Sequence, residues 1–159
     1  MTLTELFQHG QEAAEYLFGQ QGYVVPMMIG EDTEGETVPM TFNIGENKDV
    51  AAEGLKKFLV EHQIERYVSL VEAWVYEAKP DDPDAQAMLS GDARVSDHPQ
   101  RKEVIQITAE DKNGECKSGF FQIVREKGKK ATLSEFKELP EAALATGRFM
   151  GLLGEKTRH

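Results

Sequence analysis

The amino-acid sequence predicts an α+β fold, with an antiparallel sheet of five to six strands and helices packed mainly on one face. Three observations lead to this expectation. Two stretches carry apolar residues at helical spacing, two pairs of strand-like stretches are separated by glycine-containing turns, and residues 64–78 are rich in β-branched and aromatic residues. The expected order of elements is α-β-β-α-β-β-β, followed by one strand and one helix.

The chain has 159 residues, a length typical of one domain, and we expect residues 1–159 to form a single domain. Its hydrophobic fraction of 40% and charged fraction of 29% are ordinary for a globular protein. No apolar run approaches the roughly 18 residues of a membrane-spanning helix, and the N-terminal residues lack the features of a secretory signal. The single cysteine, Cys116, excludes an internal disulfide, so the composition favours a cytoplasmic protein.

The formal net charge of −10 limits the choice of partners. An acidic surface repels nucleic acid and anionic membranes, which makes both poor partners. The charge suits solubility first, and it leaves open a basic protein partner or mimicry of nucleic-acid charge. Independently of the charge, we keep a homo-oligomer as an alternative.

The first helix begins at a capping box formed by Thr2 and Glu5. Apolar residues follow at helical spacing, interrupted by Gly10, and the stretch from Gly19 to Gly22 ends the helix. A second helix is expected from its cap at Asn47 to about residue 63.

Residues 23–31 and 36–44 form the first expected hairpin. A loop of residues 33–35, with Gly35 in the left-handed conformation, pairs Asp32 with Glu36. This register places Met28 opposite Met40, on a face that is apolar along both strands.

The stretch 64–78 is the long strand at the centre of the expected sheet. Both of its faces are mostly apolar, which is typical of a strand that is covered on both sides. Glu72 is the exception, because it lies between Leu70 and Trp74 on one of these faces.

Residues 79–100 are rich in proline and aspartate, and this composition predicts a long acidic loop that favours flexibility rather than a helix or strand. Residues 101–112 and 115–126 follow as a second hairpin. Its Asn113-Gly114 turn predicts a two-residue connection that pairs Lys112 with Glu115 and Ile107 with Phe120. Residues 131–139 form the last expected strand, Pro140 begins a C-terminal helix, and residues 154–159 are a frayed tail.

Known catalytic and cofactor-binding motifs are missing from the sequence. It has no Gly-rich phosphate loop, dinucleotide-binding fingerprint, zinc-binding histidine or cysteine pair, or nucleophile elbow. The four histidines are scattered, with none three or four residues from another. We therefore expect neither a cofactor nor a metal site.

Glu72 is the one candidate for chemistry that remains. Arg66 on the same strand face is six residues away, roughly 20 Å at ~3.3 Å per residue, so any partner must come from another element. Arg101, Lys102, Arg125 and His98 are the cations that the neighbouring strands would bring.

Two interpretations of Glu72 follow. It is either a structural carboxylate, paired with an arginine across the strands or lying at a sheet edge, or part of a catalytic cleft. In the catalytic interpretation Glu72 and Glu103 act as acid and base with His98 and Arg101, and Trp74 and Tyr76 form the walls. Because the catalytic motifs are missing, we favour a non-catalytic binding protein that uses an acidic surface, with the small enzyme as the alternative.

Overall fold

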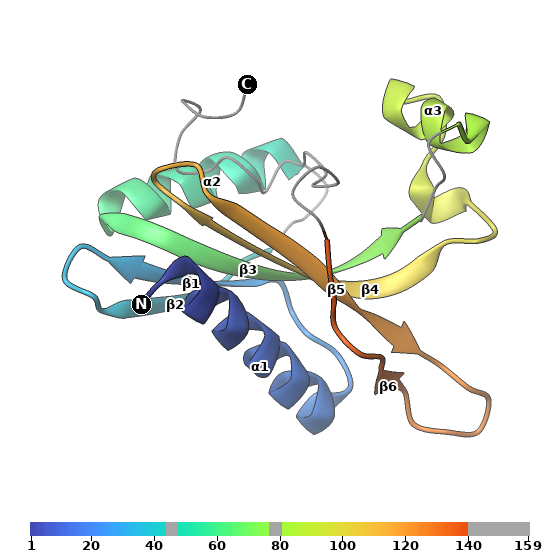
Figure 1. Cartoon of the computed structure of the whole chain (residues 1–159), viewed down its shortest axis with the longest axis horizontal. Helices are drawn as coiled ribbons and strands as arrows, with labels where there is room; N and C mark the ends of the chain where they lie inside the picture. The colour runs from blue at the N-terminus through green and yellow to red at the C-terminus, as the bar shows by residue number, and fades with distance from the viewer. Residues whose placement is uncertain (44–47, 77–80, 140–159) are drawn as a thin grey trace.

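The computed structural model describes residues 1–43, 48–76 and 81–139, and it confirms the α+β class and the antiparallel sheet (Figure 1). Within these residues seven strands form one sheet in the order β2-β1-β3-β4-β5-β6, with β7 also paired to β5. In chain order the elements are α1 (Leu3–Gln21), β1 (Met27–Asp32), β2 (Thr37–Thr41), α2 (Lys48–Glu61), β3 (Ile64–Val75), α3 (Pro83–Ser90), the 3₁₀ turn η1 (Val95–Asp97), β4 (Lys102–Asp111), β5 (Cys116–Val124), β6 (Thr132–Leu133) and β7 (Lys137–Glu138).

Helix α1 begins and ends at the signals expected from the sequence. The Glu5 N–H donates to Thr2 Oγ1 at 3.1 Å and the Thr2 N–H donates to Glu5 Oε1 at 2.9 Å, which completes the capping box. Gly22 adopts a left-handed conformation, with φ of 79°, and donates its N–H to Phe18 O.

The two long helices lie on opposite faces of the sheet, which corrects the expectation that helices pack mainly on one face (Figure 1). On one face α1 packs against a cluster that includes Val68, Leu70, Ile105, Ile107, Ala109, Phe121 and Ile123. On the other face α2 covers Met28, Ile64 and Tyr67 with Ala52, Leu55 and Leu59. The reason is visible in β3, whose apolar residues point alternately to both faces and therefore need a cover on each.

Both hairpins use the same turn sequence, Asp-x-x-Gly-Glu. In the first, the Asp32 N–H donates to Glu36 O at 2.9 Å, and Asp32 Oδ1 accepts the N–H groups of Glu34 and Glu36. Gly35 is left-handed with φ of 81°, and Met28 lies opposite Met40. The predicted three-residue loop and register are confirmed.

The two-residue turn predicted for the second hairpin is wrong. Asp111 donates its N–H to Glu115 O at 3.1 Å and accepts the N–H groups of Asn113 and Glu115, with Gly114 left-handed at φ of 83°. The loop therefore has three residues, because the Asp111 side chain organises it as Asp32 does in the first hairpin. The register shifts by one, so Ile107 lies opposite Gly119 instead of Phe120.

We expect Asp111→Ala to lower the unfolding free energy by about 1–2 kcal/mol, since Asp111 is buried and two hydrogen bonds to its carboxylate are lost. Asp111→Asn keeps an acceptor at the same position and should lose less than half as much. Urea denaturation of the two variants checks this, and equal stability of Asp111→Ala and the unsubstituted protein would show that the side chain does not organise the turn.

The stretch 79–100 is not entirely a loop, because residues 83–90 form α3. Asp82 caps this helix by accepting the Asp84 N–H at 2.9 Å, Pro83 occupies its first turn, and Gly91 ends it in the left-handed conformation. The expected strand over 131–139 consists of the two short strands β6 and β7. The Asn47 cap, the helix from Pro140 and the tail 154–159 lie outside the described residues.

The ends of the sheet differ in what surrounds them. The start of β3 lies between the β1–β2 turn and the β4–β5 turn, since Asp32 pairs with Ile64 and Asp111 with Arg66. The end of β3 lies beside the start of β4, next to η1 and α3 (Figure 1). None of the helices in the described part is long and apolar enough to cross a membrane.

Candidate functional site

Glu72 and Glu103 come together at the end of β3. Strands β3 and β4 are neighbours, with Glu72 opposite Ile105 and Trp74 opposite Glu103. The two glutamates are therefore diagonal neighbours on the sheet face that α1 covers further along. The predicted proximity of the two carboxylates to each other is present in the structure.

Glu72 is half-buried at this point, and its Oε1 accepts the Val24 N–H at 3.4 Å. Burial raises the pKa of Glu72, because water is removed from its charged form. The hydrogen bond from Val24 and the charge of Arg125 lower this pKa, whereas the negative charge of Glu103 raises it, and the net effect is upward.

The arginine side chains of the candidate site contact groups other than the Glu72 carboxylate. Glu103 Oε1 accepts a hydrogen bond from Arg125 Nε at 2.6 Å. The guanidinium of Arg101 lies 4.6 Å from the ring centroid of Trp74, and its NH1 donates to His98 O at 3.1 Å. Arg125 comes from a neighbouring strand, as was expected of an arginine partner for Glu72, but it pairs with Glu103.

His98 has both ring nitrogens engaged. Its Nδ1 accepts the Gln100 N–H at 3.0 Å, so Nε2 carries the proton in the neutral ring and donates to Asp84 Oδ2 at 2.9 Å. The ring also stacks on Tyr76, with centroids 4.0 Å apart, and the His98 side chain is 11% exposed. A general base needs a free nitrogen, and in this arrangement His98 has none.

Tyr76 and His98 together hold α3 against the end of β3. The Tyr76 hydroxyl donates a hydrogen bond to Asp82, the residue that caps α3. This hydrogen bond, with smaller contributions from desolvation and from the charges of Asp82 and Asp84, raises the pKa of Tyr76 to about 12. The same bond lowers the pKa of Asp82.

Sequence reasoning missed this anchoring role of Asp82 and Asp84. The signal was an aspartate followed directly by proline, which is typical of a helix cap and first helical position. It lies within a segment whose composition favours a loop.

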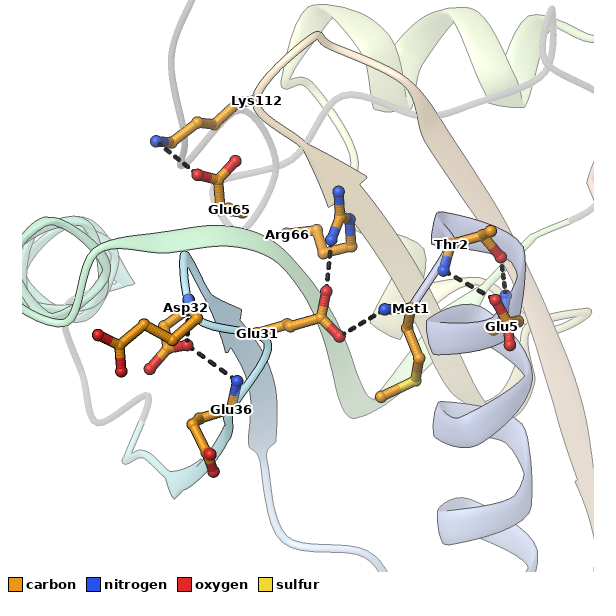
Figure 2. Close-up of polar contacts among 10 residues, drawn as sticks. Met1, Thr2, Glu5, Glu31, Asp32, Glu36, Glu65, Arg66 and Lys112 are labelled. Atoms are coloured by element: carbon orange, nitrogen blue, oxygen red, sulfur yellow. Dashed lines mark hydrogen bonds and ion pairs between the residues drawn. The ribbon is translucent and has the colours of Figure 1, made fainter.

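A second polar cluster lies at the opposite end of β3 (Figure 2). Glu31, which is 2% exposed, pairs with Arg66 through one carboxylate oxygen and with the Met1 amino group, 2.9 Å away, through the other. Lys112 and Glu65 form a more exposed pair nearby, 3.5 Å apart. Figure 2 shows Glu31 next to the first hairpin turn and the Lys112–Glu65 pair across the β3 ribbon from that turn.

The two hairpin turns carry three exposed glutamates at this end of the sheet, beside the exposed Lys112. The aspartates of the turns are used for backbone hydrogen bonds, whereas Glu34, Glu36 and Glu115 extend into solvent. We call these three glutamates the acidic end.

Among residues 1–43, 48–76 and 81–139, no three histidine, cysteine, aspartate or glutamate side chains are grouped so that they could hold a metal ion. Comparison with protein-family models, with curated proteins and with solved structures gives no match.

We expect Glu72→Gln to stabilise the protein at neutral pH by about 0.5 kcal/mol, a value limited by solvent screening of this half-buried group. A raised pKa means that the stability contributed by Glu72 is full below its unfolded pKa and is lost as pH rises through its folded pKa. Glutamine removes the charge and keeps an acceptor for Val24, so the gain should vanish near pH 3. Thermal unfolding across this range checks the sign, and a loss of stability at pH 7 would contradict it.

Proposed function

We propose that this protein is a non-catalytic binding protein whose acidic end takes a basic protein partner. The observation that carries the proposal is the state of the four candidate catalytic residues. Three of them, Glu103, His98 and Arg101, already contact Arg125, Asp84 and the Trp74 ring, respectively, which supports a structural role for these side chains. The net charge of −10 and the exposed glutamates of the acidic end supply the attraction.

The test compares two triple charge reversals. E34K/E36K/E115K changes the acidic end, and E12K/E15K/E135K makes the same change at three other exposed glutamates. A partner captured by cross-linking in an extract of the source cells is identified, purified and titrated against each variant. We expect the first variant to bind at least tenfold more weakly, since three charge pairs of roughly 0.5 kcal/mol each amount to about that factor.

The control variant should stay within about threefold of the unsubstituted protein. Equal weakening of both variants would mean that overall charge is responsible, and the acidic end would then not be the binding surface. A strictly monomeric protein that retains no partner would overturn the proposal itself.

The alternative function is a small enzyme in which Glu72 and Glu103 act as acid and base. The raised pKa of Glu72 beside a second carboxylate is the observation that favours it. It requires a ligand that reaches both glutamates and His98 together. In a small-molecule NMR screen, joint shifts of these three side-chain resonances would favour the enzyme, and shifts confined to the acidic end with a basic peptide would favour binding.

A further inference from the structure

Strand β3 extends beyond its neighbour β1. It pairs with β4 from Arg66 to Val75, but with β1 only as far as Leu70. Within the described part of the chain, residues 71–75 therefore have a strand on one side and none on the other. In the part of the chain that the structure describes, the last five of the twelve residues of β3 thus form a sheet edge.

The hydrogen-bonding pattern identifies which backbone groups face this edge. The backbone N–H of Asp111 donates to Glu115 O, on the side of β5. The N–H of the next residue, Lys112, donates to Glu65 O at 3.0 Å, on the side of β3. Successive residues of an antiparallel strand direct their backbone groups alternately to one side and the other. With the register of β3 and β4, this alternation means that the backbone groups of Ala73 and Val75 form hydrogen bonds with β4. Glu72 and Trp74 consequently direct their N–H and C=O groups away from β4, to the side where the segment before β1 reaches the Glu72 carboxylate through the Val24 N–H.

The side chains along the edge are apolar apart from Glu72. Trp74 is 43% exposed on the face that carries Arg101, and the half-buried Val71, Ala73 and Val75 lie on the other face. An open apolar edge invites another strand, and a charged residue placed in it prevents indiscriminate pairing. Glu72 has this position between Leu70 and Trp74, so its charge restricts which strands can pair with the edge.

We propose that the β3 edge from Glu72 to Val75 binds an extended segment of a basic partner protein by strand addition. The proposal rests on the proposed function and gives it a second, more specific contact. The added segment alternates basic and apolar residues, with a basic side chain beside Glu72 on one face and apolar side chains against Ala73 and Val75 on the other. A second copy of this chain is a poorer occupant, because each copy carries a net charge of −10.

The electrostatics of Glu72 agree with a cationic neighbour. Glu103 forms an ion pair with Arg125 at 2.6 Å, whereas Glu72 accepts a hydrogen bond of 3.4 Å from the Val24 N–H and is affected by the charge of Arg125 without pairing with it in the described residues. A lysine or arginine of the added strand would favour the ionised form of Glu72, so binding should strengthen as pH rises from 4 to 7.

The test uses a blocked seven-residue peptide of alternating lysine and valine, with the glutamate–valine peptide as its control. The first readout needs no variant: a saturating amount of the lysine–valine peptide should slow hydrogen exchange of the Trp74 amide at least tenfold. The glutamate–valine peptide should bind at least tenfold more weakly. An unchanged Trp74 exchange rate would overturn the proposal.

The second readout separates the backbone of Trp74 from its side chain. Trp74→Pro removes an N–H that faces the edge and leaves the β4 ladder in place, so it should weaken peptide binding at least tenfold. Trp74→Ala keeps the N–H and should weaken binding no more than about threefold. Peptide binding to Trp74→Pro at the original affinity would contradict strand addition.

Two further outcomes distinguish this inference from the proposed function. If the captured partner binds Trp74→Pro normally but not E34K/E36K/E115K, strand addition is wrong and the acidic end remains the binding surface. If sedimentation shows that the free protein dimerises and that Trp74→Pro abolishes the dimer, a second copy occupies the edge and the proposed basic segment is wrong.

Discussion

Arg66→Met is expected to lower the unfolding free energy by about 2–3 kcal/mol, because it leaves the buried carboxylate of Glu31 with the Met1 amino group as its remaining ionic partner. Methionine retains the apolar stem that arginine contributes to the packing. The expected loss is below the usual 3–5 kcal/mol for breaking a buried pair, since the Arg66 side chain is 29% exposed and one ion pair to Glu31 remains. Urea denaturation with a common m-value measures the loss.

Lys112→Met is the matched control. It makes the same kind of change at the neighbouring Lys112–Glu65 pair, whose side chains are 50% and 35% exposed (Figure 2). We expect a loss below about 0.5 kcal/mol, as for other exposed pairs. The double variant Glu31→Met/Arg66→Met should regain most of the stability, because it removes the buried charge together with its partner. If the double variant is as unstable as Arg66→Met, the loss comes from packing and not from an unpaired carboxylate.

The parts of the fold that were predictable are those determined by local chemistry. Thr2 and Glu5 identify the start of α1 because each can satisfy a free backbone N–H of the other. Asp32 and Gly35 identify the first hairpin because an aspartate acceptor and a left-handed glycine specify the loop length. These signals need no information from distant residues.

The second hairpin shows how one strong signal can hide another. Asn113-Gly114 is a common two-residue turn, but Asp111 offers the same acceptor as Asp32 and sets a longer loop. The error shifts the register by one residue, which moves the side chains of β5 to the opposite faces of the sheet. Gly119 then occupies the α1 face where Phe120 was expected.

The candidate site was predictable only in part, for a similar reason. Adjacent strands bring Glu72 and Glu103 together, and this follows from chain order. The partners of His98 and Arg101 depend on α3 and on the outward position of Trp74, which no local pattern specifies. Side-chain pairing between elements is a property of the assembled fold.

Gly119→Ala is the second variant expected to be strongly destabilising. A Cβ at Gly119 would lie 2.4 Å from Phe136 Cζ and 2.6 Å from the backbone oxygen of Lys137. Phe136 cannot move aside easily, because its ring packs edge-on against Phe7 and Phe121, with centroids 5.5 Å and 5.0 Å away. We expect a loss of about 2–3 kcal/mol, at the upper end for overpacking, since backbone must shift as well.

The physical reason is that Phe136 occupies the space that a side chain at Gly119 would otherwise fill. The segment between β6 and β7 thereby places an aromatic ring over β5 and against α1. The added methyl group of Gly119→Ala should displace this ring and weaken the pairing of Phe120 with Lys137. Hydrogen exchange should therefore become faster at β7 before it changes in β3 or β4.

Gly54→Ala provides the matched control for the same substitution. Gly54 lies in α2, and among the described residues no atom other than its chain neighbours and the nearby helix backbone lies within 4 Å of an added Cβ, so alanine should stabilise the protein by up to about 1 kcal/mol through its helix propensity. The two variants differ in the space available, and opposite signs of their effects would attribute the Gly119 loss to contact with Phe136. If Gly119→Ala is tolerated, the α1 face of β5 must be able to open, and Phe136 would not be part of a closely packed core.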